Sequence, residues 1–248
     1  TRMRVFSYGK FAVVLRYLGD SNAYVHSTWY PAAFNPGLFC HQNTPYLIGS
    51  ASSELHLAGG PPPGEATVYN IDTGTSFKPS MEYSSCTDLY FKRCTMDGKF
   101  SVVTEANNTL RGYIRANAWP SGGGRWAQTT TSNDGGRTWS PFQMVEIDGI
   151  VIDKNVNIYT FLAVRFNATH LRARYPAVTP EGSGVWQTYS TDGVRFSRPT
   201  LLRHGHAHGP RVDLQPVEHV LQDQILSARI NLHLPVNTVA LYAIGPQG

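Results

Sequence analysis

Short runs of alternating apolar and polar residues, separated by turn residues, dominate this sequence. Runs of this kind predict β-strands. The clearest of them cover residues 11–15, 68–71, 100–104, 125–131, 157–164, 185–190, 225–230 and 238–244. Helical periodicity is nearly absent: only residues 217–227 fit a short helix, and they fit a strand equally well. The pattern predicts an all-β protein.

One turn segment recurs along the chain. Residues 125–141 and 185–199 share a Trp, a polar strand, the order Ser-x-Asp-Gly, an aromatic residue, a Ser and a Pro, and weaker copies cover residues 70–77 and 95–101. The interval from Asp72 to Asp134 is 62 residues, and that from Asp134 to Asp192 is 58. These intervals exceed the roughly 40–45 residues of a WD40 blade, so loops must absorb the difference. The recurrence predicts a fold built from repeated small sheets.

Each copy combines residue types that suit a tight hairpin. Hydroxyl and carboxylate oxygens accept hydrogen bonds from the backbone N–H groups of a turn, and glycine supplies positive φ. The terminal aromatic residue packs at the sheet edge. The positions concerned are Ser132, Asp134, Gly136, Thr138 and Trp139 in the fullest copy, Asp72, Gly74 and Phe77 in the first, and Ser190, Asp192 and Phe196 in the last. This chemistry predicts a structural role for them and not catalysis.

Residues 132–139, Ser-Asn-Asp-Gly-Gly-Arg-Thr-Trp, resemble the Asp-box, or BNR repeat, of sialidases and their relatives, and residues 70–77 and 190–197 match it in part. The resemblance implies a sialidase-like β-propeller of four-stranded antiparallel blades, formed by one domain over residues 1–248, with the boxes at its periphery. About 45 residues per blade would give five or six blades, whereas the observed spacing gives four or five. We therefore expect a propeller with few blades, or one that is incomplete in this chain.

Arginines precede the boxes on several predicted strands. In sialidases such arginines point to the central funnel and bind the substrate carboxylate, and the resemblance extends this role to the arginines here. The candidates are Arg16, Arg115, Arg165 and Arg229. Arg111 shares a strand face with Arg115, so the pattern does not separate the two. The alternative is that these arginines pair with acidic residues at blade edges or face solvent.

A sialidase also uses an acid/base Asp and a Tyr nucleophile that a Glu activates. The resemblance implies Asp20 as the acid, Tyr242 as the nucleophile and Glu146 as the Glu, with Glu105 and Glu181 as alternatives. The Arg-Ile-Pro type of segment that opens sialidase sequences is missing here. Two hypotheses therefore stand: a glycoside hydrolase that acts on an acidic sugar at the funnel, and a non-catalytic propeller that binds glycans or forms part of a larger extracellular assembly.

Composition narrows the class of protein. A hydrophobic content of 41% with 15% charged residues fits a globular domain and excludes disorder. The 21 basic residues, 16 Arg and 5 Lys, are spread along the chain, whereas nucleic-acid binding requires them to cluster on one element. No apolar run reaches the roughly 18 residues that span a bilayer. The chain begins at Thr1 with no initiator Met and no signal-peptide pattern, so we expect a processed product or part of a longer protein.

Cysteines and sequons indicate an extracellular location. Acceptor triplets for N-glycosylation begin at Asn107 and Asn167. Cys86 and Cys94 are spaced to join the two arms of a hairpin as a disulfide, which leaves Cys40 unpaired. Together these features predict a secreted or cell-surface glycoprotein with glycan partners.

Two groups of side chains are further binding candidates. His204, His206 and His208 lie on one face of an extended segment, as metal ligands do, although the neighbouring glycines and proline favour a loop with solvated histidines. No cofactor is predicted. Aromatic pairs in predicted loops could stack on sugars: Trp29-Tyr30, Trp119-Pro120 and Tyr175-Pro176. Trp126 and Trp186 head repeat strands, so we interpret them as packing residues.

Overall fold

The structure consists of β-strands and their connections. The computed structural model describes residues 2–8, 11–17, 24–31, 34–50, 66–81, 94–96, 100–105, 107–118, 124–153, 155–205, 219–221, 224–226 and 238–243. No helix occurs among these residues, so the all-β prediction is confirmed for them. It follows that no helix in this part of the chain is long and apolar enough to cross a membrane.

Two predicted elements differ from the structure. The strands β22 (His219–Leu221) and β23 (Gln224–Leu226) form an antiparallel pair, so the helical alternative for residues 217–227 is wrong where the chain is described. The expected strand at 157–164 is divided into β16 (Asn157–Ile158) and β17 (Leu162–Arg165). Both pair with the same strand, β18 (Leu171–Thr179), at opposite ends of it.

Four antiparallel arrays of four strands, which we call blades I to IV, form the body of the molecule, and the short strand β16 joins blades III and IV into one ten-stranded sheet. Blade I consists of β24 (Thr238–Ala243), β1 (Arg2–Tyr8), β2 (Phe11–Tyr17) and β3 (Tyr24–Pro31). Blade II consists of β4 (Phe34–His41), β5 (Thr44–Ser50), β6 (Ala66–Asn70) and β7 (Ser76–Phe77). Blade III consists of β10 (Ser101–Thr104), β11 (Leu110–Ala118), β12 (Arg125–Ser132) and β14 (Gln143–Met144), with β9 (Cys94–Met96) at the end of β11. Blade IV consists of β17, β18, β19 (Gly182–Ser190) and β21 (Thr200–His204).

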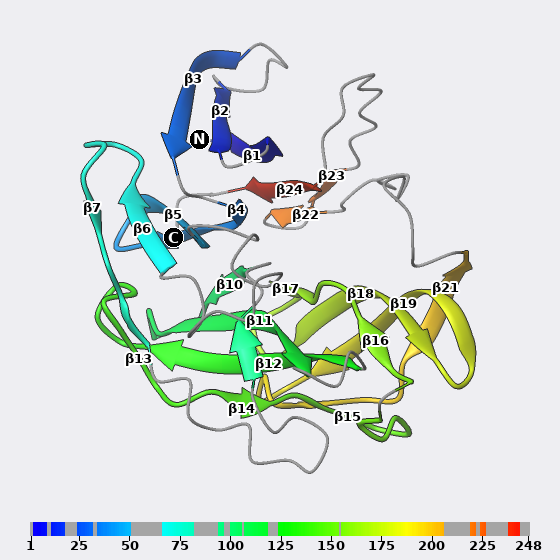
Figure 1. Ribbon diagram of the computed structural model, residues 1–248. Coiled ribbons are helices and arrows are strands. Elements are labelled where there is room, and N and C mark those ends of the chain that lie inside the picture. The colour runs from blue at the N-terminus through cyan, green and yellow to red at the C-terminus, as the bar shows by residue number, and fades with distance from the viewer. Residues whose placement is uncertain are drawn as a thin grey trace.

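The first strand of each blade lies on the inside of the molecule. In Figure 1 the strands β4, β10, β17 and β24 lie toward the middle, while β3, β7 and β21 lie toward the outside. The inner strand β10 lies against both β4 and β17, and β4 lies against β24. Radially arranged four-stranded blades of this kind form a β-propeller. The predicted fold class is confirmed at this level.

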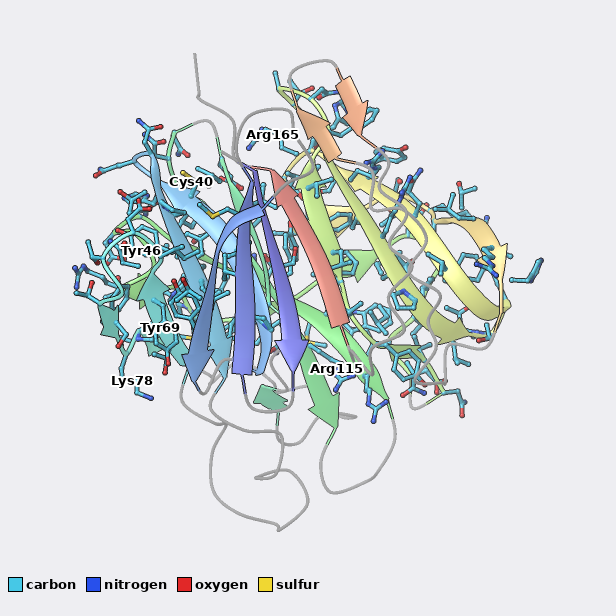
Figure 2. The ribbon with its side chains drawn as sticks, turned by 90° about the horizontal axis from the view of Figure 1, so that it is seen from above. Cys40, Tyr46, Tyr69, Lys78, Arg115 and Arg165 are labelled. Atoms are coloured by element: carbon cyan, nitrogen blue, oxygen red, sulfur yellow. The ribbon has the colours of Figure 1, made fainter. Side chains whose placement is uncertain are left out.

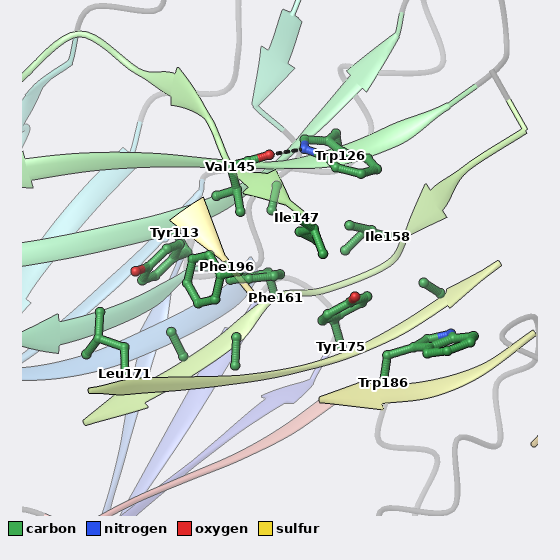
Figure 3. Packing of buried hydrophobic residues seen from close by; sticks show 14 of the residues in the cluster. Tyr113, Trp126, Val145, Ile147, Ile158, Phe161, Leu171, Tyr175, Trp186 and Phe196 are labelled. Atoms are coloured by element: carbon green, nitrogen blue, oxygen red, sulfur yellow. Dashed lines mark hydrogen bonds between the residues drawn. The ribbon is translucent and has the colours of Figure 1, made fainter. Parts of the chain in front are cut away.

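Hydrophobic cores lie between successive blades. One cluster joins blade I to blade II, the second joins blade II to blade III, and the largest joins blade III to blade IV (Figure 3). Successive residues of one strand point to opposite faces, and blade II uses both of its faces. Leu47 packs toward blade I, and its neighbour Ile48 packs toward blade III. A strand buried on both faces explains why these runs are more continuously apolar than simple alternation predicts.

Two of the predicted sugar platforms are core residues instead. Tyr30 lies in β3 and is 3% exposed, and Tyr175 lies in β18 and is fully buried, so neither ring is in a loop. Both pack in the cores between blades. Trp126 and Trp186 are buried in the core between blades III and IV, as predicted. Trp119 lies outside the described residues, and of Trp29 only the backbone, in β3, is described.

Candidate functional site

The complete Asp-box is a turn held by its own side chains. The Asp134 carboxylate accepts hydrogen bonds from the backbone N–H groups of Arg137 and Thr138 and from the Thr138 hydroxyl at 2.6 Å. The Ser132 hydroxyl donates to Asp134 and accepts the Gly136 N–H. Trp139 is buried, and its indole N–H donates to the Gly136 carbonyl. In this copy the hydroxyl, the carboxylate and the indole all bond to atoms of the turn itself.

The other two boxes repeat this design with changes. Asp192 accepts from the N–H groups of Val194 and Arg195, and the Ser190 hydroxyl accepts the Gly193 N–H. In the copy at 70–77 the side-chain carbonyl of Asn70, at the position of Ser132, accepts the N–H groups of Asp72 and Thr73, two and three residues further on. Gly74 has a φ of 73° there, which explains why glycine occurs at this position.

Acid should weaken the box turns. Partial burial alone would raise the pKa of Asp134, but the hydrogen bonds from Thr138, Ser132 and Arg137 outweigh it and lower the pKa below its ordinary value. A lowered pKa in the folded state means that the stabilisation is present above the unfolded-state pKa, near 3.9, and is lost as pH falls through the folded-state pKa. We expect Asp134→Asn to lower the free energy of unfolding at pH 7. On acidification below about pH 4, the free energy of unfolding of the variant should fall less than that of the unsubstituted protein. Urea denaturation at a series of pH values measures this, and an unchanged acid dependence would contradict it.

The boxes of blades III and IV also fasten each of these blades to the preceding one. The strand β13 (Thr138–Trp139) pairs in parallel with β8 (Ser80–Met81), which follows the box of blade II. In the same way, β20 (Arg195–Phe196) pairs with β15 (Glu146–Ile147), which follows the box of blade III. Gly193, with a φ of 75°, lies so close to Arg111 of blade III that an added Cβ would meet the arginine side chain. The boxes therefore act in blade assembly.

The molecule has two faces that differ in their turns. The turns of the boxes lie at the same end of the blades as the turns that follow the inner strands. In blade III, Leu110 pairs with both Thr104 and Ser132, and in blade IV, Leu171 pairs with both Arg165 and Ser190. The box turns are 71–75, 133–137 and 191–194, and the turns after the inner strands are 42–43, 105–109 and 166–170. We call this end the box face. The ends of β11 and β18 and the starts of β12 and β19 lie at the other end, which we call the opposite face.

Arg115 and Arg165 lie on different faces. Arg165 is at the end of the inner strand β17, where its guanidinium donates to the carbonyls of Thr104 and Ala168 on the box face. Arg115 lies five residues beyond Leu110 along β11, a separation of about 17 Å at the usual rise per strand residue. Figure 2 shows the two arginines at opposite ends of the strands. The predicted convergence of these two arginines is therefore wrong, because one lies on an inner strand and the other near the far end of a second strand.

The candidate glutamates each contact an arginine. Glu105 lies 2.6 Å from Nε of Arg111, in a partly buried ion pair on the box face. Glu146 lies on the outer rim, where it pairs with Arg195 at 3.3 Å. Glu181, in the turn after β18, lies 3.7 Å from Arg198. Glu146, the predicted activating glutamate, thus lies at the contact between blades III and IV.

Arg115 instead meets Arg125 and Tyr159 on the opposite face. Its guanidinium donates to the Tyr159 carbonyl at 3.2 Å, and the guanidinium of Arg125 lies over the Tyr159 ring, 5.3 Å from its centroid. The strands β11 and β12 bring the two arginines together, and the segment that crosses from blade III to blade IV supplies the tyrosine. We call these three residues the arginine cluster. Sequence reasoning missed both residues because it looked for arginines on the strand that precedes the box strand, whereas Arg125 begins the box strand β12 itself and Tyr159 lies in the crossing segment.

Electrostatics in the arginine cluster favour an anion. Burial and then the like charge of Arg125 lower the pKa of Arg115 to about 9, while Tyr159 opposes this change. The guanidinium is still protonated at neutral pH. Burial also raises the pKa of Tyr159, against the effect of both arginines, so its phenol stays neutral and able to donate. An anion beside two guanidinium groups is attracted by both of them.

The remaining predicted site residues are described only in part or not at all. Asp20, Arg229, Cys86, His206 and His208 lie outside the described residues, and for Arg16, Cys94 and Tyr242 the structure describes only the backbone, in β2, β9 and β24. His204 is exposed at the end of β21. Cys40 is a free cysteine. No group of three potential metal ligands occurs in the part of the chain that is described.

A scan against protein-family models and a search of curated proteins give no match to this chain. Solved structures do match. A protein of unknown function from Dyadobacter fermentans superposes with a TM-score of 0.56 and 13% identity, over 82% of this chain and 57% of that one. The α-L-arabinanase of Penicillium chrysogenum, solved with arabinobiose, has a TM-score of 0.53 and 12% identity, over 78% and 59%. The likeness is one of fold.

This chain spans less than three fifths of the length of either protein. The Hadza microbial sialidase Hz136 has a TM-score of 0.47 and 13% identity, over 77% of this chain and 44% of its own length. The first two structures therefore agree with a propeller fold for the described residues. The Asp-box resemblance therefore rests on the sequence and on the geometry of the turns.

Proposed function

We propose that this protein is an extracellular glycan-binding β-propeller whose ligand carries an acidic group, and that the arginine cluster on the opposite face binds that group. The observation that supports this most strongly is the meeting of Arg115, Arg125 and Tyr159 where β11, β12 and the crossing segment come together. The planar forks of two arginines suit a carboxylate or sulfate. A tyrosine beside them offers a ring and a hydroxyl to a sugar.

Relatives in fold make a carbohydrate the preferred ligand class. The arabinanase that shares the fold was solved with arabinobiose, so this architecture accommodates a sugar. Propeller sites for small ligands commonly lie at one end of the blades, where loops and strand ends converge. The arginine cluster lies at such an end, away from the boxes.

Binding without catalysis is the better supported of the two hypotheses. Glu105, Glu146 and Glu181 each lie beside an arginine on the box face, the rim or a turn. A catalytic carboxylate pair would have to stand on both sides of one glycosidic bond. The roles of Asp20 and Tyr242 in hydrolysis remain predictions.

We further propose that the propeller has five blades. The pair β22–β23 lies between blade IV and β24 in the sequence, and β22 lies against β24. Residues 205–237 connect β21 to β24, and these 33 residues are fewer than the roughly 40–45 of a WD40 blade, so the fifth blade would be a short one.

An oligosaccharide panel tests the proposed function. Uronic-acid, sialic-acid and sulfated oligosaccharides should bind more tightly than neutral arabino- and gluco-oligosaccharides, and their affinity should fall as salt rises because charges contribute to it. Isothermal titration calorimetry at two ionic strengths measures both effects. The same oligosaccharides, followed by chromatography, report hydrolysis. Equal affinity for neutral and acidic members would disprove the proposal.

A further inference from the structure

The two N-glycosylation triplets occupy corresponding turns of neighbouring blades. The turn 105–109 joins the inner strand of blade III to its second strand, and the turn 166–170 does the same in blade IV. The same backbone hydrogen bond closes both turns. It runs from the N–H of Glu105 to the carbonyl of Thr109 at 2.7 Å, and from the N–H of Phe166 to that of His170 at 2.9 Å. Both triplets therefore lie on the box face.

The two asparagine side chains are held in the same way. The side-chain carbonyl of Asn107 accepts the N–H of Thr109 at 3.1 Å, and that of Asn167 accepts the N–H of Thr169 at 2.9 Å. This Asx turn fixes which end of each amide is oxygen, because only oxygen can accept. The amide nitrogen then points away from the turn, and both side chains are exposed. This nitrogen is the atom to which an N-glycan is attached.

Both turns are anchored to the blade beneath them. The Thr109 hydroxyl donates to the side chain of Asn133 in the box of the same blade, at 2.7 Å. The ring of Phe166 packs edge-on against Tyr189, and the guanidinium of Arg172 lies over it. The acceptor nitrogens are thus presented from fixed turns at one end of the propeller.

We propose that Asn107 and Asn167 are both N-glycosylated when the chain is made in a eukaryotic secretory pathway, and that the two glycans cover the box face of blades III and IV. The co-reactant is a lipid-linked oligosaccharide diphosphate supplied by the host cell. The amide nitrogen forms a bond to the anomeric carbon, the bond from that carbon to the phosphate oxygen breaks, and the proton lost by nitrogen leaves with the lipid diphosphate. Glycans are bulky and solvated, so this face would be closed to large partners. The opposite face and the rim stay open.

Secretion from cultured eukaryotic cells, followed by mass spectrometry of the intact protein and its glycopeptides, tests this inference. The unsubstituted protein should carry two glycans, Thr109→Ala or Thr169→Ala should each lose one, and the double variant should lose both. Thr109→Ser and Thr169→Ser keep the hydroxyl and the acceptor triplet, so they should keep both glycans. Peptide N-glycosidase should release the glycans from the folded protein without denaturant, because both turns are exposed.

Glu181→Asn provides a matched control on the opposite face. It completes an acceptor triplet with Gly182 and Ser183 at the turn after β18, and should add a third glycan. Secreted, folded protein with both native asparagines unmodified would overturn the inference, and so would glycans released only after denaturation. None of these readouts requires a ligand, so they are independent of the proposed binding function.

Discussion

Replacing Trp126 by alanine should lower the free energy of unfolding by about 4 kcal/mol, the usual cost of removing a large buried aromatic side chain. Trp126 is 1% exposed and lies in the core between blades III and IV. Its indole N–H donates to the carbonyl of Val145 at 2.6 Å, and Val145 itself is fully buried. The substitution therefore removes packing and a hydrogen bond together. Urea denaturation followed by circular dichroism measures the loss.

Trp186 supplies a matched comparison for the hydrogen bond. It occupies the corresponding strand of blade IV and is 3% exposed, but its Nε1 atom has no hydrogen-bond partner among the described residues. Trp126→Phe and Trp186→Phe remove similar volumes, whereas only the first leaves a buried carbonyl without its indole donor. We expect Trp126→Phe to cost about 2 kcal/mol more than Trp186→Phe. Equal losses would show that the bond to Val145 contributes nothing.

The blade scaffold could be predicted from the sequence because its signals are local. The Ser-x-Asp spacing and the glycines specify a turn through contacts within a few residues, and the turn at Asp134 has that geometry. The burial of Trp126 and Trp186 follows from their repeated position. The proline after Tyr175 predicts a break in the chain, yet Pro176 pairs within β18 opposite Val185, so Tyr175 lies in a strand. Packing between blades decides such a position, and the local sequence does not record it.

The binding site could not be predicted to the same extent because it depends on strand register and on which end of a blade a residue occupies. Arg115 and Arg165 share the pattern of an arginine before a box, but they lie on different strands of their blades and at opposite ends of them. Arg125 and Tyr159 are 34 residues apart in sequence and meet only because the crossing segment passes beside the start of β12, where Arg125 pairs with Asn157. No local motif marks such a meeting.

Arg125→Gln should weaken the binding of acidic oligosaccharides by about tenfold or more, which corresponds to about 1.4 kcal/mol, and should leave the binding of neutral ones unchanged. The substitution removes one of two guanidinium groups that would contact the anion, and its loss should also flatten the salt dependence of affinity. Because Arg125 lowers the pKa of Arg115, removing its charge relieves repulsion within the arginine cluster. The free energy of unfolding should therefore not fall in parallel with affinity, so a binding effect is distinguishable from a folding effect.

Arg203→Gln, at an exposed arginine on the outer strand β21, removes the same charge elsewhere and should bind like the unsubstituted protein. If both variants lose affinity equally, net charge and not the arginine cluster attracts the ligand.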